Sequence, residues 1–173
     1  MNKFCVAMIL TGCVLTCAVP GMGADPEEGE YYRIKNVRSK KVLSVADDGK
    51  EKGAPIVQVV PGPSELQQWQ FVKVGGYYKI VNRKTGMALN VESESMQEGA
   101  PIIQWDARVN KKNQQWSLVK KGDFFAIKVR HSGLVLDVAA GSKERRVSLI
   151  QYPLQRNDNG NQIFELVPVK AKP

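Results

Sequence analysis

The sequence is poor in the residues on which most enzymes and metal sites depend. It has three cysteines, at positions 5, 13 and 17, and one histidine, His131. All three cysteines fall within an apolar N-terminal segment, so the rest of the chain has no thiol for a disulfide, a zinc site, an iron–sulfur cluster or a nucleophile. A single histidine also leaves little acid–base chemistry near neutral pH. We therefore predict a protein that uses neither a metal nor a cofactor and is not an enzyme.

The motifs of the common enzyme classes are missing as well. The chain has no phosphate-binding loop, no His-rich metal spacing and no nucleophile elbow. A glycosidase needs two carboxylates across a cleft, one of them with a raised pKa. The acidic pairs Asp47 with Asp48 and Glu92 with Glu94 are adjacent or nearly adjacent in the sequence. Nothing in their surroundings marks either pair as catalytic.

An apolar segment stands at the N-terminus. Residues 1–24 combine a positive start, an apolar run from position 4 to 19 and a small-residue exit. This layout is typical of a secretory signal peptide, and it is too short and too weakly flanked for a membrane span. We expect a secreted, periplasmic or cell-surface protein, with an acidic linker at 25–30. The alternative is lipoprotein anchoring at Cys13, because Leu10-Thr11-Gly12-Cys13 resembles a lipoprotein cleavage box.

Basic residues outnumber acidic ones without gathering in one block. The 25 lysines and arginines against 17 aspartates and glutamates give a net charge of +8, or +7 once residues 1–24 are removed. Because these cations are scattered and an exported protein seldom meets nucleic acid, we expect no nucleic-acid partner. An attraction to acidic glycans or cell surfaces fits export better. The 149 residues after position 24 suffice for one domain with its own core.

The most informative feature is an internal repeat. Four short blocks recur three times at spacings of 46 to 48 residues. In order they are an aromatic pair, a Leu-x-Val segment, a Gly-Ala-Pro-x-x-Gln segment that is loose in its third copy, and a Gln-x-Trp or Gln-x-Phe element. The copies start at Tyr31, Tyr77 and Phe124 and close at Trp69, Trp116 and Phe164. Four blocks that keep one spacing indicate a repeat architecture.

Each block has the character of a β-strand. The blocks are short, rich in β-branched or aromatic residues, and separated by turn sequences such as 83–86 and 157–160. No stretch sustains a helical period for three turns. Four strands in each of three repeats give twelve strands, and closure of the repeats on themselves removes exposed sheet edges. We predict an all-β domain at 31–168, with repeats 31–76, 77–123 and 124–168 and a tail at 169–173.

Three Gln-x-Trp-type elements in phase with Leu-x-Val and Gly-Ala-Pro-x-x-Gln segments resemble the ricin-type β-trefoil lectins. The same module is often attached to secreted glycoside hydrolases as a carbohydrate-binding domain. The resemblance covers residues 31–168, and it implies a β-trefoil, which is a closed barrel with pseudo-threefold symmetry. It also implies up to one shallow sugar site in each repeat.

Two aromatic residues remain when the repeats are compared. Ten of the twelve aromatics after residue 24 keep an apolar equivalent in every repeat, which indicates packing. Trp105 and Tyr152 are equivalent to each other, and the first repeat has Val59 at that position. A core position gains nothing from replacing valine with tryptophan. We therefore predict exposed platforms for the face of a sugar ring in the second and third repeats.

The resemblance implies where the polar partners of these platforms lie. An aspartate in the Leu-x-Val segment and an Asn-Gln pair at the start of the Gln-x-Trp element would bind the sugar hydroxyls. The glutamine is kept in all three repeats, which favours a structural hydrogen bond, with Gln114 and Gln162 also facing the ligand. The third repeat has Asp137, Asn161 and Gln162 with Tyr152; the second has Asn90, Asn113 and Gln114 with Trp105; the first has Ser44, Leu66 and Gln67 with Val59. We predict the best sugar site in the third repeat, a weaker or altered site in the second, and a structural remnant in the first.

Together these residues predict a secreted carbohydrate-binding lectin whose partners are glycans or polysaccharides. By resemblance, galactose-type and xylose-type sugars are the leading candidates, and the residues do not choose between them. The alternative is a β-trefoil that binds or inhibits proteins through its loops and has no sugar pocket. Arg146 replaces the glycine found at positions 53 and 99, and a reshaped third-repeat loop would favour this alternative.

Overall fold

The computed structural model describes residues 23–157 and 160–170. The predicted signal peptide therefore lies outside the described residues except for its last two positions, as do the last three residues of the predicted tail. Every regular element in the described ranges is a β-strand or a single turn of 3₁₀ helix. None of the helices among these residues has the length and apolar character needed to cross a membrane.

Twelve strands follow the predicted blocks, which confirms the all-β class and the number of strands. They are β1 (Tyr31–Asn36), β2 (Val42–Val45), β3 (Ile56–Val59), β4 (Trp69–Val74), β5 (Tyr77–Asn82), β6 (Ala88–Val91), β7 (Ile102–Trp105), β8 (Trp116–Lys121), β9 (Phe124–Val129), β10 (Val135–Val138), β11 (Leu149–Tyr152) and β12 (Phe164–Pro168). The 3₁₀ turns are η1 (Glu65–Gln67), η2 (Glu92–Glu94), η3 (Lys112–Gln114) and η4 (Ala139–Gly141).

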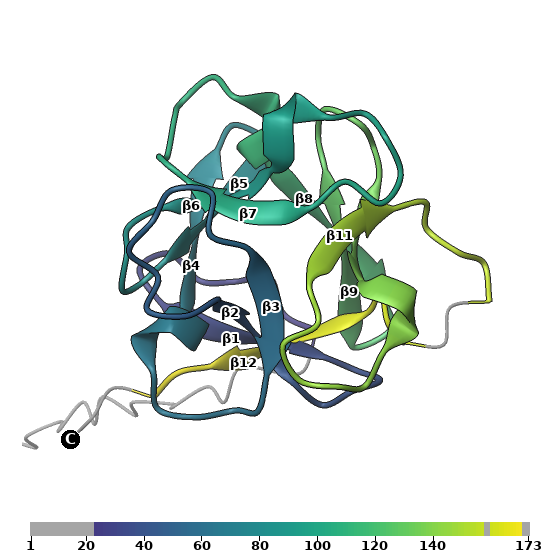
Figure 1. The fold of residues 1–173 in the computed structure, drawn as a ribbon. Helices are drawn as coiled ribbons and strands as arrows, with labels where there is room; N and C mark the ends of the chain where they lie inside the picture. Colours follow the sequence, from purple (N-terminus) through teal and green to yellow (C-terminus); the bar gives the residue numbers. More distant parts are fainter. Residues whose placement is uncertain (1–22, 158–159, 171–173) are drawn as a thin grey trace, which may run out of the picture.

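Six of the strands close into a barrel. β1 pairs with β4, β4 with β5, β5 with β8, β8 with β9, β9 with β12, and β12 with β1, all antiparallel. The hairpins β2–β3, β6–β7 and β10–β11 cover one end of the barrel (Figure 1). Isolated bridges, such as the one between Val57 and Ser148, tie the hairpins to one another. The result is the predicted β-trefoil, in which closure leaves no barrel strand with an open edge.

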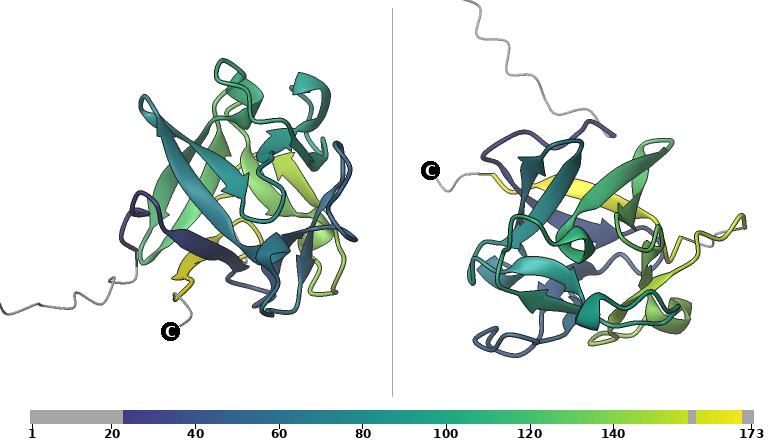
Figure 2. Two further views of the ribbon diagram at one scale, coloured as in Figure 1. Left: turned by 90° about the vertical axis from the view of Figure 1, so that its left-hand side faces the viewer. Right: turned by 90° about the horizontal axis from the view of Figure 1, so that it is seen from above.

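The two ends of the described chain meet at the end of the barrel that is opposite to the hairpins (Figure 2). The backbone N–H of Val169 donates to the carbonyl of Tyr31 at 2.8 Å. The backbone N–H of Glu27 donates to the Tyr32 hydroxyl at 2.9 Å. The predicted linker and the first residues of the predicted tail thus pack against β1, far from the hairpin end.

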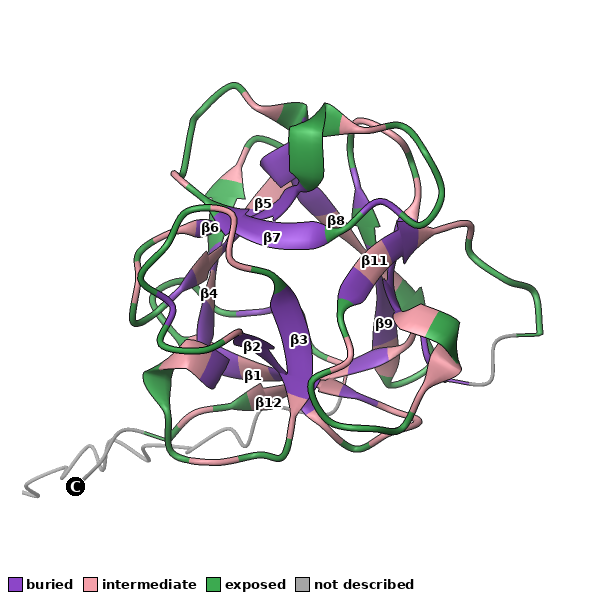
Figure 3. Cartoon of the chain, in the orientation of Figure 1, coloured by how far each residue is buried: buried purple, intermediate pink, exposed green. Residues whose placement is uncertain are grey.

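The core fills the barrel and the space beneath the hairpins (Figure 3). The repeat-closing aromatics Trp69, Trp116 and Phe164 are completely buried. The two indole N–H groups donate to the carbonyls of Leu43 and Leu89, each at 3.1 Å. Each tryptophan therefore satisfies its one polar group within the hairpin of its own repeat. Burial of these large rings holds the barrel and the three hairpins that cover its end together.

The aromatic pairs that open the repeats divide between two environments. Side chains alternate along a strand, so only one member of each pair can point into the barrel. Tyr32 is buried. Tyr31 and Tyr77 lie under the guanidinium groups of Arg83 and Arg130, which are 4.6 and 4.5 Å from the ring centroids. These outer tyrosines pack against cations instead of the core.

A buried glutamine in each hairpin fixes a loop of another repeat. Gln58, Gln104 and Gln151 end the third block of each repeat and have no exposed surface. Gln151 donates to the carbonyls of Ser95 and Gln97 in the second repeat, both at 2.8 Å. Gln104 binds the first-repeat loop, and Gln58 binds the third-repeat loop, in the same way. These bonds hold the loops that flank the candidate sites.

Candidate functional site

Each repeat has a hollow between its hairpin, the loop after its second strand and the start of its Gln-x-Trp element. The third-repeat hollow has a volume of about 370 Å³. It is lined by Asp137, Ala140, Gly141, Ile150, Tyr152, Gln155 and Asn161. The structure therefore brings together three of the four residues predicted for this site. The fourth, Gln162, is buried against Asp137.

The Asp137 carboxylate is held on the floor of the third-repeat hollow by two amides. Asn161 Nδ2 lies 3.0 Å from each carboxylate oxygen, and Gln162 Nε2 lies 2.7 Å from Oδ2. A buried charge is tolerated when it is hydrogen-bonded, and a charged acceptor makes shorter and stronger bonds than a neutral one. Asp137 is only 4% exposed. The side chain is therefore fixed in one orientation before any ligand arrives.

Gln162 also orients the segment that follows Tyr152. Its Nε2 donates to the carbonyl of Pro153, and its Oε1 accepts from the backbone N–H of Gln155, both at 2.9 Å. Gln162 has no exposed surface and does not line the hollow. These bonds are the structural ones that a glutamine kept in all three repeats indicates, and a contact of Gln162 with a sugar stays a prediction.

The second-repeat hollow has the same arrangement with a neutral amide at its centre. Its volume is about 450 Å³, and Asn90, Trp105, Asn113 and Gln114 all line it. Asn90 Oδ1 accepts from Asn113 Nδ2 at 2.8 Å and from Gln114 Nε2 at 3.1 Å. Gln114 also binds the segment after Trp105 through two further hydrogen bonds. The same network therefore holds a carbonyl oxygen where the third repeat has a carboxylate.

One buried acceptor in the second-repeat hollow has no partner among the described residues. The amide of Asn113 is oriented by its nitrogen, which donates to Asn90 Oδ1 and, at 2.9 Å, to the carbonyl of Val91. Asn113 Oδ1 is buried and accepts no hydrogen bond. An unsatisfied buried acceptor costs about 1–3 kcal/mol. A ligand hydroxyl that donates to this oxygen would remove that cost.

Trp105 is exposed, as the comparison of repeats predicted. Its side chain lies at the end of β7 and is 38% exposed, and its equivalent Tyr152 is half-buried. Gly53 of the first repeat lies beside the ring, because a Cβ atom at Gly53 would be 3.7 Å from Trp105. The φ angle of Gly53 is +84°, a conformation that favours glycine. The glycine leaves the space beside the ring open.

The first-repeat hollow keeps the size but not the chemistry of the other two. Its volume is about 420 Å³, and Ser44, Val59 and Leu66 line it at the three key positions. Ser44 Oγ donates to the carbonyl of Val45 at 2.9 Å, and Gln67 binds only the backbone of residues 60 and 62. This hollow has neither an aromatic platform nor a fixed polar fork.

Arg146 also lines the first-repeat hollow, together with Val59. Its backbone N–H donates to the carbonyl of Gln58 at 2.7 Å. In the same way, the backbone N–H groups of Gly53 and Gly99 donate to the carbonyls of Gln104 and Gln151, each in the following repeat. The sequence analysis placed the effect of Arg146 on the third-repeat loop. The structure instead places its side chain in the first-repeat hollow, because each of these loops adjoins the next hollow around the ring.

Two of the hollows include residues of another repeat, which comparison of the repeats did not predict. Gly53 lines the second-repeat hollow, and Arg146 and Ser148 line the first-repeat hollow, whereas all the residues that line the third-repeat hollow belong to the third repeat. The second-repeat loop is also contacted by His131 of the third repeat, whose Nε2 lies 2.8 Å from the carbonyl of Ser95.

A signal for this arrangement was present. Gly53 and Gly99 are each followed in the next repeat by an aromatic residue, Trp105 or Tyr152. Arg146 stands at the same position in the third repeat, and the first repeat has Val59 in place of the aromatic residue.

Comparison with protein families agrees with the fold and with the repeated hollows. The family model described as ricin-type beta-trefoil lectin domain-like matches residues 20–105 and 112–172. The chain belongs to this family. A search of the curated proteins finds no match.

Three solved structures show the extent of the likeness. The designed threefold-symmetric protein ThreeFoil is 38% identical, with a TM-score of 0.77 over 80% of this chain and 99% of its own. An exo-β-1,3-galactanase from Clostridium thermocellum is 37% identical, with a TM-score of 0.78 over 84% of this chain and 31% of the enzyme. This chain thus spans less than a third of the galactanase. The Macrolepiota procera ricin B-like lectin, solved with lactose, shares the fold at 16% identity, with a TM-score of 0.71 over 83% of this chain and 99% of the lectin.

Proposed function

We propose that the protein is a secreted carbohydrate-binding lectin module without catalytic activity. Its main sugar site is the third-repeat hollow, the second-repeat hollow is a weaker or altered site, and the first-repeat hollow binds no sugar. One observation carries this proposal. The carboxylate of Asp137 is fixed by Asn161 and Gln162 on the floor of a hollow that Tyr152 also lines.

The arrangement suits the two chemical faces of a pyranose ring. The C–H face of the sugar packs against the ring of Tyr152, and its hydroxyl groups turn toward Asp137 and Asn161. Because a carboxylate is a charged acceptor, its bonds to sugar hydroxyls are stronger than those of a neutral oxygen. Little ordering is needed on binding, since both polar side chains are already held in place. Two such shallow sites on one rigid body gain affinity when both engage one polysaccharide.

The class of sugar is proposed from the relatives. The Macrolepiota procera lectin was solved with lactose, and the 37% identical relative is an exo-β-1,3-galactanase. Galactose-type sugars are therefore the first ligands to test, and xylose-type sugars the second.

Export is proposed from the sequence of residues 1–24. Mass spectrometry of the protein from the culture medium and from the membrane fraction tests it. A mature N-terminus near Asp25 supports secretion, and a lipid-modified N-terminal Cys13 supports anchoring. An intact N-terminus inside the cell contradicts both.

A glycan array with matched variants tests the binding function. Asp137→Ala and Tyr152→Ala should each weaken binding of the preferred neutral glycan by at least about tenfold, which corresponds to about 1.4 kcal/mol. Ser44→Ala and Val59→Ala are the equivalent changes in the first repeat and should leave binding unchanged. Thermal unfolding confirms that each variant is folded. Binding that survives both third-repeat changes contradicts this site, and no binding to any glycan favours the protein-binding alternative.

A further inference from the structure

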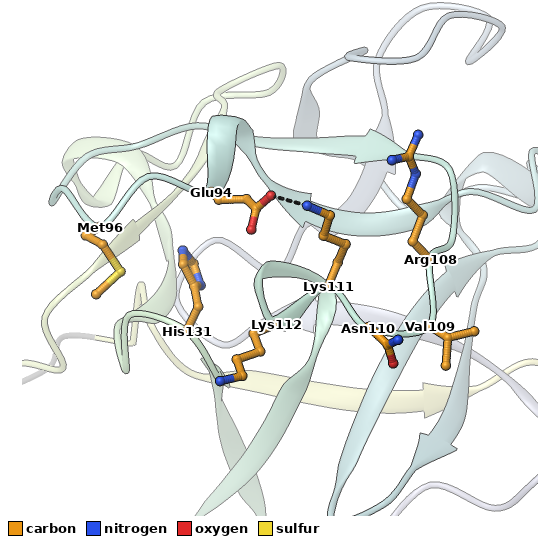
Figure 4. Close-up of a pocket in the computed structure, with 8 residues that line it drawn as sticks. All are labelled: Glu94, Met96, Arg108, Val109, Asn110, Lys111, Lys112 and His131. Carbon is orange, nitrogen blue, oxygen red and sulfur yellow. Dashed lines mark hydrogen bonds and ion pairs between the residues drawn. The ribbon is translucent and has the colours of Figure 1, made fainter.

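The second-repeat hollow adjoins a second, outer hollow, whose lining residues are drawn in Figure 4. The outer hollow has a volume of about 720 Å³ and shares Glu94, Arg108 and Lys111 with the inner one of about 450 Å³. His131 lies at the end of the outer hollow that is remote from Arg108 (Figure 4). The two hollows form one continuous groove, which has room for a second sugar residue beside the one that Trp105 would carry.

The charged residues that line the outer hollow are mainly cations. Arg108, Lys111 and Lys112 face it, and its one carboxylate is that of Glu94. Glu94 forms an ion pair with Lys111 at 2.5 Å, and this contact lowers the pKa of Glu94. Arg108 and Lys112 form no ion pair with any described residue. Two positive charges on this part of the groove are therefore left without a counter-charge.

The other carboxylates near the groove lie toward its inner end. Asp106, which follows Trp105, is paired with Lys52 at 2.6 Å. Glu92 lines the inner hollow and not the outer one. The outer hollow therefore has an excess of positive charge, whereas the two cations and two carboxylates that line the inner hollow balance. A negatively charged ligand group is attracted to the outer hollow.

The floor of the inner hollow is neutral, unlike that of the third-repeat hollow. Asn90 stands where the third repeat has Asp137, and the unpartnered oxygen of Asn113 is ready to accept a bond from a hydroxyl. In the third-repeat hollow, Asp137 is the one charged residue among those that line it. The two sites therefore differ in the sign of the charge that they present to a ligand.

We propose that the second-repeat site recognises an acidic glycan, an inference that rests on the sugar-binding function proposed above. One sugar residue lies on Trp105 and donates a hydroxyl to Asn113 Oδ1. A carboxylate or sulfate group on the adjacent part of the glycan lies in the outer hollow, between Arg108 at one end and Lys112 at the other (Figure 4), and both cations attract it. The third-repeat site, with Asp137 on its floor, takes a neutral sugar.

Calorimetric titration of the Tyr152→Ala protein tests this inference, because that change removes the third-repeat platform and leaves the second-repeat groove intact. Three probes are compared: lactose, lactose sulfated on its galactose, and the same disaccharide with a uronic acid in place of galactose. At least one acidic probe should bind about fivefold or more tightly than lactose, with a preference that falls as salt is added. Which acidic probe is preferred distinguishes a sulfate from a carboxylate ligand.

Two variants with equal loss of charge separate a specific site from general attraction. Arg108→Gln with Lys112→Gln should reduce the preference for the acidic probe to less than about twofold and leave lactose binding nearly unchanged. Lys120→Gln with Lys121→Gln removes two exposed cations from the barrel end opposite the hairpins and should keep the preference. Trp105→Ala should abolish binding of all three probes.

Equal affinity for the three probes overturns the inference. So does a preference for the acidic probe that survives the Arg108 and Lys112 changes. A preference that is lost equally in the Arg108/Lys112 variant and in the Lys120/Lys121 variant also overturns it. The function proposed above is tested separately, by neutral glycans on the protein with an intact third repeat. If Asp137-dependent binding is found there and no acidic preference is found here, the inference alone fails. If no glycan binds either protein, both fail.

Discussion

The third and first repeats share one backbone frame and differ in what their hollows present to a ligand. Their closing aromatics, Phe164 and Trp69, are both completely buried. The floor of the hollow is nevertheless a hydrogen-bonded carboxylate in one and Ser44 in the other. The comparison teaches that the fold depends on positions kept in all three repeats, whereas the chemistry of the hollow depends on a few positions that vary.

The difference between these two hollows extends beyond their own residues. Gly53 of the first repeat lies beside Trp105 in the second-repeat hollow, whereas Arg146 of the third repeat lines the first-repeat hollow together with Val59. A Cβ atom at Gly53 would lie 3.7 Å from Trp105, so a long side chain at this position would reach the space beside the ring. The first hollow has therefore changed on both of its sides.

Removal of Gln162 should give the largest effect and should separate the two repeats most clearly. In Gln162→Leu, the Asp137 carboxylate loses a hydrogen bond of 2.7 Å, and the segment after Tyr152 loses two. Because the groups left behind are buried, we expect a loss of about 2–3 kcal/mol in the free energy of unfolding. Urea unfolding measures the stability, and calorimetry should show third-repeat sugar binding weakened at least tenfold at temperatures where the protein is folded.

Gln67→Leu is the matched control in the first repeat. It breaks the two bonds of Gln67 to the backbone of residues 60 and 62 but leaves no charge without a donor. The free energy of unfolding should fall less in this variant than in Gln162→Leu, and sugar binding should be unchanged. An equal loss of sugar binding in both variants would show that Gln162 acts on the whole fold and not on Asp137.

Conversion of the first hollow to third-repeat chemistry should create a new sugar site. The required changes are Ser44→Asp, Val59→Tyr, Leu66→Asn and Arg146→Gly. We expect one additional sugar bound per protein, detected by chemical-shift changes in first-repeat residues during a titration. The same protein with Arg146 retained is the control, and it should gain little because the arginine occupies the space beside the new ring. A new site of equal strength in both proteins would contradict the competition between residue 146 and residue 59.

A smaller effect on sugar affinity is expected when the floor of the second-repeat hollow is given the carboxylate of the third. Asn90→Asp places a carboxylate between Asn113 Nδ2 and Gln114 Nε2, as Asp137 lies between its two amides. The stronger acceptor should tighten lactose binding to the second-repeat site by about threefold to tenfold and weaken binding of an acidic sugar. Titration of the Tyr152→Ala protein isolates this site. Tighter binding of both neutral and acidic sugars would show that floor charge does not set the preference.

Much of the fold follows from the spacing of the repeats. The predicted copies start at Tyr31, Tyr77 and Phe124, and the strands β1, β5 and β9 begin at these residues. A block that recurs in phase three times must occupy equivalent places, and alternation along short strands then separates core from surface. Differences between equivalent positions also pointed to Trp105, because a large aromatic opposite a valine is hard to explain by packing.

The contacts between repeats were beyond the reach of this reasoning. Gln104 binds carbonyls of residues 49 and 51, more than 50 positions away in the sequence. Such contacts depend on the way in which the ring closes, and a comparison of the repeats with one another contains no information on that geometry. The same applies to the outer hollow of the second repeat, which combines η2, the segment before η3 and a turn of the third repeat. The structural hydrogen bonds of Gln162, by contrast, did follow from the repeats, because a glutamine kept in all three, including the first, indicates such a role.

The smallest effect concerns the barrel, where the second and third repeats differ at a buried position. Lys79 on β5 is 7% exposed, and its third-repeat equivalent is Ala126. Burial lowers the pKa of Lys79, so the unfolded chain binds the proton more tightly than the native protein does. The buried charge therefore lowers the free energy of unfolding at neutral pH, and this loss of stability disappears as pH rises past the ordinary lysine pKa of about 10.4.

Lys79→Met should therefore raise the free energy of unfolding at pH 7 by up to about 1 kcal/mol, with the gain shrinking in thermal melts at pH 10 to 11. Lys128→Met, at an exposed position of β9, is the control, and an equal, pH-independent gain in both variants would show that added apolar surface, not the buried charge, is responsible.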